Sequence, residues 1–293
     1  MTNIKPVTSR TLQKMKENKE KITMLTAYDF STAKYIDECG VDTILVGDSL
    51  GMTILGYDTT IKVTIEDMLT FTKAVTNGVQ RAFVVADMPF LSYHTSKEQT
   101  TINAGKLIQA GAKAVKLEGA SDFIVDEVAH LTQCGINVVG HLGFTPQYIN
   151  TIGGYFVQGK SYENTIKLLE AAKKLEAAGI CALVLEMVPE ESAKYISDNL
   201  SVPTIGIGAG RYCDGQVLVI DDILGKYPGI VPKFVKQYAN IKEIMKTAIT
   251  QYNSEVKNGL FPFKENIFNL TEEESLKLER NLVKSYSRIK KKH

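Results

Sequence analysis

Short apolar runs rich in β-branched residues alternate with longer amphipathic stretches from residue 21 onward. The short runs have the length of strands, and the longer stretches repeat their apolar positions with the period of a helix. The expected strands are 22–27, 43–46, 82–86, 114–117, 138–141, 182–188, 204–207 and 216–220. The expected helices are 31–38, 65–75, 97–110, 123–133, 162–178 and 190–199. This alternation indicates repeated βα units around a parallel sheet.

Three of the expected helices end in a glycine that stands just before a strand, at Gly40, Gly111 and Gly179. Glycine is the usual left-handed cap at the end of a helix, so these positions predict short turns from helix to strand. An open doubly wound sheet would show the same local pattern, but eight units in one run without a linker favour a (β/α)8 barrel. We therefore predict one barrel domain over residues 1–263.

The C-terminal part of the chain has a different character. Residues 221–261 read as further helix and connecting turns, and residues 264–293 form a highly charged tail. Leucines recur along that tail at positions 270, 276, 278 and 282. This spacing is typical of an amphipathic helix, which could lie on the barrel or on a neighbouring subunit.

The composition is that of an ordinary globular protein, with 44% hydrophobic and 23% charged residues in a chain of 293. The formal net charge of +1 offers no basic surface for a nucleic acid or an anionic membrane, so we expect small-molecule partners. The N-terminal segment lacks the apolar core of a signal peptide, and no apolar run approaches the roughly 20 residues of a spanning helix. We therefore expect a cytoplasmic protein without membrane contact.

Cysteine and glycine patterns point away from two common cofactors. The four cysteines, Cys39, Cys134, Cys181 and Cys213, form no C-x-x-C pair, which argues against zinc and against a disulfide framework. Residues 206–210 read GIGAG, but they lack the G-x-G-x-x-G spacing and follow the seventh expected strand, so they are weak evidence for NAD. In a barrel, such glycines favour the close approach of a ligand.

Polar side chains stand at or near the carboxyl ends of five successive expected strands, where a parallel barrel carries its active site. They are Asp48, Ser49, Asp87, Lys116, Glu118, His141 and Glu186. A single acid in such a place could simply cap the following helix. Five strands in succession predict a catalytic mouth instead.

Three of these acids, Asp48, Asp87 and Glu118, suggest a metal site. Carboxylates crowded together repel each other unless a cation lies between them. Hard oxygen donors without histidine or cysteine suit Mg²⁺ or Mn²⁺ better than zinc. Such an ion could bind the oxygens of a 2-keto acid and make a proton on the adjacent carbon removable.

The remaining charged residues suggest the other roles. Glu186 stands in the apolar stretch LVLEMV and is the candidate general base. Lys116 and Glu118 have the same strand parity, so both side chains point to one face of their strand. If that face is the barrel interior, Lys116 could neutralise a substrate carboxylate or enolate, a role compatible with a salt bridge to one of the acids. His141 could donate a hydrogen bond to the substrate or serve a structural role.

Several sequence blocks resemble the ketopantoate hydroxymethyltransferase family. They are KPVT (5–8), KITMLTAYD (21–29), VGDSLGM (46–52), ADMPF (86–90), AVKLEG (114–119), GHLGFTPQ (140–147), GGY (153–155) and IGIGAG (205–210). These blocks follow the family order over residues 5–262. The resemblance implies a (β/α)8 enzyme of pantothenate synthesis that transfers a hydroxymethyl group from 5,10-methylenetetrahydrofolate to 3-methyl-2-oxobutanoate and forms 2-dehydropantoate.

The resemblance also implies roles for individual residues. Asp48, Asp87 and Glu118 correspond to the magnesium site, and Glu186 corresponds to the proton acceptor. The contacts with the keto acid correspond to Asp48, Ser49, Asp87 and Lys116. The family implies a homo-oligomer, decameric in typical bacterial members.

Two features depart from the family pattern. Asp221-Asp222 stands where the family usually has His-Asp, and the tail beyond about residue 263 is longer than usual. The sequence leaves two alternative interpretations open. One is a magnesium barrel like the phosphoenolpyruvate mutase and isocitrate lyase group, which characteristically uses a reactive cysteine at a strand end. The other is a catalytically silent barrel, which would need no base such as Glu186.

Overall fold

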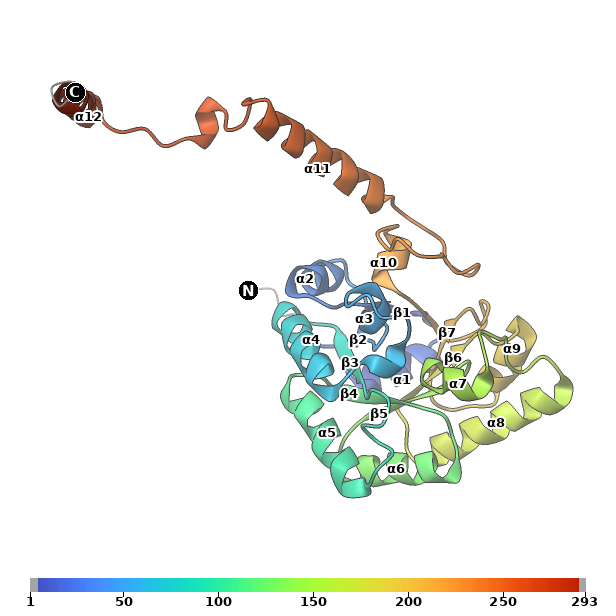
Figure 1. Cartoon of the computed structure of the whole chain (residues 1–293). Coiled ribbons are helices and arrows are strands. Elements are labelled where there is room, and N and C mark those ends of the chain that lie inside the picture. The colour runs from blue at the N-terminus through green and yellow to red at the C-terminus, as the bar shows by residue number, and fades with distance from the viewer. Residues whose placement is uncertain (1–4, 290–293) are drawn as a thin grey trace. The chain divides into compact units, whose positions relative to one another are not determined.

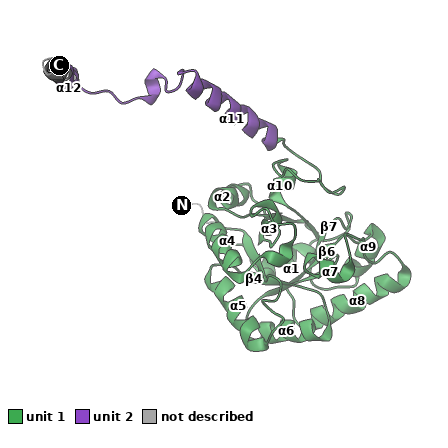
Figure 2. Cartoon of the chain, in the orientation of Figure 1, with its two compact units in different colours: residues 1–240 green, residues 241–293 purple. Residues whose placement is uncertain are grey.

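The computed structural model describes residues 5–289, with side chains described up to Asn281 (Figure 1). The chain forms two compact units, residues 1–240 and 241–293, which we call unit 1 and unit 2 (Figure 2). Unit 1 contains a closed barrel of eight parallel strands paired in chain order. The predicted (β/α)8 barrel is therefore confirmed.

The strands agree with the sequence expectation to within two residues at each end. They are β1 (Ile22–Thr26), β2 (Thr43–Val46), β3 (Phe83–Asp87), β4 (Ala114–Glu118), β5 (Val138–Gly143), β6 (Ala182–Glu186), β7 (Thr204–Ile207) and β8 (Gly215–Leu218). β6 ends at Glu186 rather than residue 188 because Met187 adopts a left-handed backbone conformation, with φ of 49°. β8 ends before Ile220, whose N–H donates to the Thr26 hydroxyl instead of continuing the ladder.

Six long helices cover the outside of the barrel, as expected (Figure 1). They are α2 (Phe30–Glu38), α4 (Ile65–Gly78), α5 (Lys97–Gln109), α6 (Asp122–Gln133), α8 (Tyr162–Ala177) and α9 (Glu190–Asp198). Shorter elements lie in the loops: α3 (Leu50–Thr53), η1 (Thr60–Lys62), η2 (Pro146–Tyr148), α7 (Ile149–Ile152) and α10 (Ile220–Ile223).

The N-terminal helix α1 (Ser9–Glu17) was absent from the sequence expectation. It buries Leu12 and Met15 among side chains of the barrel interior, including Ile22 and Val217. A second apolar layer lies between the strands and the covering helices. The barrel is therefore filled from its amino-terminal end, which leaves its carboxyl end for polar residues.

Unit 2 consists of α11 (Ile241–Lys257), η3 (Lys264–Asn266) and α12 (Glu272–Ile289). Helix α12 confirms the helical character expected of the tail, although the side chain of Leu282 and residues 290–293 lie outside the described part. The domain boundary expected at residue 263 stays a prediction. Among the residues the structure describes, no helix combines the length and the apolarity needed to cross a membrane.

Candidate active site

The predicted site residues of β3 to β6 lie on the inner face of the barrel. Lys116 and Glu118 alternate along β4 with the outward-packed Val115 and Leu117, which confirms that the two charged side chains share the interior face. The strand register sets Asp87 beside Lys116, Glu118 beside His141, and Glu186 beside Gly143. Four of these side chains are buried, whereas the carboxylate side chain of Glu186 keeps 17% of its surface exposed.

These acids do not cap the following helices. The side chains of Ser96 and Ser121 accept the first-turn N–H groups of α5 and α6. Helix α3 starts at Leu50, and Ser49 before it makes no side-chain cap hydrogen bond. The carboxylate of Asp48 accepts a hydrogen bond from Gln147 instead. The structural explanation of these carboxylates as helix caps is therefore wrong.

Lys116 lies at the centre of the charged cluster. Its Nζ is 3.2 Å from Asp87 Oδ1, 3.6 Å from Glu118 Oε1 and 3.2 Å from His141 Nδ1. Burial acts to lower the pKa of Lys116, but the charges of Asp87, Glu118 and Asp48 outweigh burial and raise it. The ammonium group therefore stays charged inside the barrel mouth.

Asp48 and Asp87 are joined directly, because the backbone N–H of Asp48 donates to Asp87 Oδ2 at 3.0 Å. Burial, followed by the charges of Asp87 and Glu118, holds the pKa of Asp48 well above its usual range. Burial also raises the pKa of Asp87, against the opposing effect of Lys116. One lysine thus compensates the acids only in part, and a further cation would stabilise their ionised forms.

His141 connects the acid cluster with the candidate base. Its Nδ1 is 3.3 Å from Glu118 Oε1, and its Nε2 is 3.3 Å from Glu186 Oε2. Burial and Lys116 act to lower the pKa of His141, but Glu118 and Glu186 outweigh them and raise it to about 9. Burial acts to raise the pKa of Glu118, yet His141, Lys116 and the N–H of Gln147 together lower it. The two glutamates therefore favour the protonated form of the His141 ring.

Ser49 takes a different partner from the acids. Its Oγ lies 2.8 Å from the hydroxyl of Tyr28, which follows β1. A Cβ at Gly47 would approach to 2.8 Å from Ser49 Oγ and 3.5 Å from Asp87 Oδ2. Glycine at position 47 therefore leaves room for two of the predicted site residues.

Two buried residues of the site were missed from the sequence. Gln147 lies in η2 after β5, and Tyr93 lies in the loop after β3. Gln147 closes the GHLGFTPQ block, which was noted only for its resemblance to a family. The available signal was its place in the same block as His141, which was already a candidate site residue.

The donor atoms at the mouth fit Mg²⁺ chemically. They are carboxylate oxygens, and Asp87 Oδ1 is buried without a well-directed hydrogen bond. Among the side chains described, those of residues 5–281, no three Asp, Glu, His or Cys residues stand in the arrangement of a formed metal site. Mg²⁺ often needs only one or two carboxylates beside water and substrate oxygens, so this finding is compatible with the donor set.

The fold and the site define an α/β barrel enzyme. Its fold resembles phosphonopyruvate hydrolase, with a TM-score of 0.58 at 11% identity, covering 96% of this chain and 99% of that one. It also resembles 2,3-dimethylmalate lyase, described as a member of the PEP mutase/isocitrate lyase superfamily, with a TM-score of 0.57 at 14% identity and coverage of 94% and 98%. At these identities the likeness concerns the fold alone.

Residues 6–264 match the model of the family described as ketopantoate hydroxymethyltransferase. The chain is 58% identical over 270 residues to the 3-methyl-2-oxobutanoate hydroxymethyltransferase of Thermoanaerobacter sp. (strain X514), covering 92% of this chain and 98% of the relative. It is 53% identical over 266 residues to that of Bacillus cereus (strain AH187), with coverage of 90% and 95%. The chain belongs to the ketopantoate hydroxymethyltransferase family.

Family membership makes the chain a hydroxymethyltransferase of the pantothenate pathway and decides between the readings left open. The interpretation as a catalytically silent barrel is therefore wrong. The mutase and lyase group has only its fold in common with this chain. The cysteine positions also differ from the strand-end position expected of the mutase and lyase group. Cys39 and Cys134 are exposed, Cys181 precedes β6, and Cys213 precedes β8.

Proposed function

We propose that unit 1 transfers the one-carbon unit of 5,10-methylenetetrahydrofolate to 3-methyl-2-oxobutanoate, giving 2-dehydropantoate and tetrahydrofolate with the uptake of one water. The observation that carries this proposal is the charge arrangement at the mouth. Three buried acids surround Lys116, while Glu186 stands at the edge with its carboxylate partly open to solvent. This arrangement suits a 2-keto acid that is chelated at the acids, with a base nearby.

Glu186 is the proposed base for the proton on carbon 3 of the keto acid. Its carboxylate Oε2 lies 3.3 Å from the Nε2 of His141, a contact that holds the carboxylate at the edge of the charged cluster. Loss of this proton leaves an enolate, whose carbon 3 forms the new bond with the methylene carbon of the folate. Both carbon–nitrogen bonds of that methylene carbon break in the overall reaction, and the added water supplies the hydroxyl group. The second proton of the water and the proton taken from carbon 3 end on the two folate nitrogens.

The keto acid carries a carboxylate, and Lys116 is the buried cation that would neutralise it. Asp48, Ser49, Asp87 and His141 are the further proposed contacts. The hydroxyl of Ser49 lies 2.8 Å from the hydroxyl of Tyr28, which fixes its position beside the proposed substrate. This set would hold the substrate with carbon 3 toward Glu186.

Mg²⁺ is the proposed cofactor, and Asp48, Asp87 and Glu118 are the residues that would hold it. When bound, it supplies the positive charge that polarises the ketone and stabilises the enolate oxygen. The raised pKa values of Asp48 and Asp87 support this proposal, because each acid is more readily ionised beside a cation.

The test is product formation by the full chain. Purified protein with Mg²⁺, 3-methyl-2-oxobutanoate and 5,10-methylenetetrahydrofolate should form 2-dehydropantoate, identified by mass spectrometry. Formation should stop when a chelator removes the metal and resume when Mg²⁺ is restored. If the intact protein forms no 2-dehydropantoate under these conditions, the proposed reaction is wrong.

Family membership also leads us to propose a cytoplasmic homo-oligomer, with a decamer as the expected form. Ten copies of the 32.4 kDa chain would have a mass of about 324 kDa, which light scattering measures directly. The same measurement on a chain ending at residue 263 asks whether the charged tail contributes to assembly. A monomeric mass for the full chain would overturn the proposed oligomer.

A further inference from the structure

The side chain of Gln147 lies buried between two of the proposed metal ligands. Its Nε2 donates to Asp48 Oδ2 at 2.8 Å, and its backbone N–H donates to Glu118 Oε2 at 3.0 Å. Asp48 follows β2 and Glu118 ends β4, so the two acids come from strands that are not neighbours. A single residue from a third part of the barrel therefore holds one oxygen of each carboxylate.

The orientation of the Gln147 amide is fixed by its other hydrogen bonds. Nε2 also donates to the carbonyl oxygen of Met88 at 2.9 Å, and Oε1 accepts from the hydroxyl of Tyr93 at 2.7 Å. That hydroxyl in turn accepts the backbone N–H of Glu118 at 3.2 Å, so its single proton goes to Oε1. A flipped amide would set Oε1 against two acceptors, the Asp48 carboxylate and the Met88 carbonyl.

This network determines how the acids present their oxygens. Asp48 Oδ2 and Glu118 Oε2 accept from Gln147, and Asp87 Oδ2 accepts from the N–H of Asp48. Each of the three carboxylates therefore has one oxygen held by a protein donor. The other oxygen of each is left for Lys116, His141 or a cation.

The hydrogen bonds of the Gln147 side chain serve more than the packing of the barrel mouth. A leucine has a similar volume, but it would leave Asp48 Oδ2 and the Met88 carbonyl without this donor and the Tyr93 hydroxyl without its acceptor. Residues that hydrogen-bond to metal ligands without contacting the metal typically contribute 10- to 100-fold to metal affinity. Gln147 has the contacts of such a residue.

We propose that Gln147 is a positioning residue that holds Asp48 and Glu118 in the orientation in which they bind the divalent cation. It acts on metal binding and leaves proton removal at Glu186 intact once the metal is bound. This inference rests on the proposed metal-dependent function.

The test compares Gln147→Leu with Gln216→Leu, using Mn²⁺ as the probe in the presence of 3-methyl-2-oxobutanoate. Gln216 is an exposed residue of β8 whose Nε2 donates to a carbonyl, that of Gly210, so the same chemical change is made outside the site. Loss of the electron paramagnetic resonance signal of free Mn²⁺ reports binding. Gln147→Leu should raise the Mn²⁺ dissociation constant about 10- to 100-fold, and Gln216→Leu should leave it within twofold of the unmodified protein.

A second readout separates positioning from general damage. Hydrogen–deuterium exchange at carbon 3 of the keto acid, measured against Mn²⁺ concentration, should need more metal in Gln147→Leu and return to within about threefold of the unmodified maximal rate at saturation. A residue that only supports the packing of the mouth would lower the maximal rate without shifting the metal dependence, and that result would overturn the proposal.

Tyr93→Phe covers the case in which Gln147→Leu fails to fold. It removes one hydroxyl and should raise the Mn²⁺ dissociation constant a few-fold, because the amide loses the partner that orients it. If Gln147→Leu folds and binds Mn²⁺ normally, the inference is overturned. If Gln147→Leu does not fold, unchanged Mn²⁺ affinity in Tyr93→Phe overturns it. Neither result would contradict the proposed metal-dependent function. Failure of the unmodified protein to bind Mn²⁺ would overturn the metal-dependent function and the inference together.

Discussion

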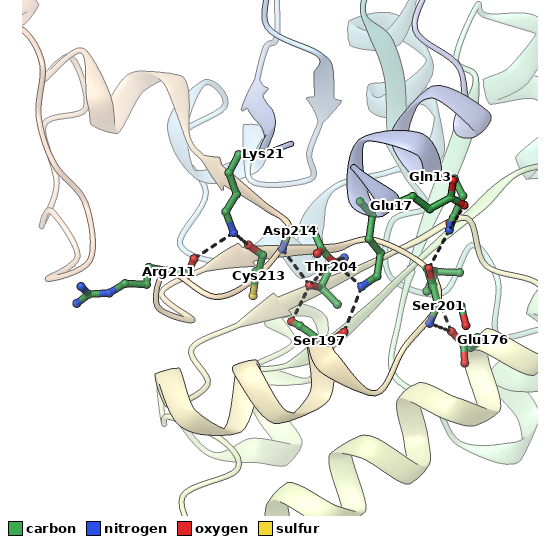
Figure 3. A network of polar contacts seen from close by, with 12 residues as sticks. Gln13, Glu17, Lys21, Glu176, Ser197, Ser201, Thr204, Arg211, Cys213 and Asp214 are labelled. Atoms are coloured by element: carbon green, nitrogen blue, oxygen red, sulfur yellow. Dashed lines mark hydrogen bonds and ion pairs between the residues drawn. The ribbon is translucent and has the colours of Figure 1, made fainter. Parts of the chain in front are cut away.

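The two ends of the barrel both contain partly or fully buried charges, but they use them differently. At the amino-terminal end, Lys16 of α1 reaches Asp214 before β8, with Nζ 2.7 Å from Oδ2. Asp214 belongs to a network of polar contacts with Thr204 and Ser197 (Figure 3). The same Asp214 oxygen accepts the N–H and the hydroxyl of Thr204, at 2.8 and 3.0 Å, and the Thr204 hydroxyl is shared with Ser197. One cation thus meets one anion, and hydrogen bonds surround the pair.

The carboxyl end of the barrel shows the opposite balance. Asp48, Asp87 and Glu118 lie beside Lys116 and His141, so the acids outnumber the basic groups, and the pKa of Asp48 and of Asp87 is raised. Asp87 Oδ1 also lacks a well-directed hydrogen bond. Charge balance therefore distinguishes the two ends. The balanced amino-terminal end has the arrangement of a stabilising ion pair, whereas the excess of acids at the carboxyl end matches the proposed binding of a cation and an anionic substrate.

The largest expected effect concerns the base. Glu186→Gln keeps the shape of the side chain but removes its ability to accept a proton, so exchange of the carbon 3 proton should slow by roughly 100- to 10,000-fold. Proton NMR of the keto acid in heavy water measures the rate. Glu191→Gln, at an exposed position on α9, is the matched control and should exchange normally. An undiminished rate in Glu186→Gln would remove Glu186 from this role.

The same aspartate-to-asparagine change at each end of the barrel tests whether the two groups of charges have different roles. Asp87→Asn should weaken Mg²⁺ binding by at least about 100-fold, while the free energy of unfolding changes by less than about 1 kcal/mol, because the charged carboxylate is already disfavoured by burial. Asp214→Asn should leave Mg²⁺ binding unchanged and lower stability by about 2 kcal/mol through its lost charge-assisted bonds.

Calorimetric titration with MgCl₂ and thermal melting measure both quantities on both variants. The distinction between the two ends would be contradicted if Asp214→Asn weakened metal binding as much as Asp87→Asn did. It would also be contradicted if Asp87→Asn caused the larger loss of stability.

The smallest expected effect concerns Asp222, another acid that follows a carboxyl strand end. Burial, and then the charge of Asp221, raises the pKa of Asp222 from 3.8 to about 6. Because the folded-state pKa is the higher one, the contribution of Asp222 to stability is fully present below about pH 4 and is lost as the pH rises through about 6.

Asp222→Asn should therefore be more stable than the unmodified protein at pH 7.5, by about 1 kcal/mol after allowance for solvent screening, and should match it near pH 4. Melting curves at the two pH values measure the difference. A variant that is less stable at pH 7.5 than the unmodified protein would show that the charge of Asp222 is stabilising.

The sequence alone predicted the strands well because each is a distinct apolar run, and the strand-end residues followed from the barrel rule applied to those runs. Helix α1 was missed because only Leu12 and Met15 are buried in an otherwise polar helix. The contact between Gln147 and Asp48 joins residues 99 positions apart, which no local pattern reveals. The charge of His141 could not be predicted either, because it depends on two glutamates from neighbouring strands.

The most direct test of the central claim is whether the intact protein removes the carbon 3 proton only when a metal is present. The protein is incubated with 3-methyl-2-oxobutanoate in heavy water, without folate, and the carbon 3 proton signal is followed by NMR with Mg²⁺, with a chelator, and after Mg²⁺ is restored. We expect the carbon 3 proton to exchange with Mg²⁺, to stop exchanging with the chelator, and to exchange again once Mg²⁺ is restored. Equal exchange rates with Mg²⁺ and with the chelator, or no exchange in either, would contradict it.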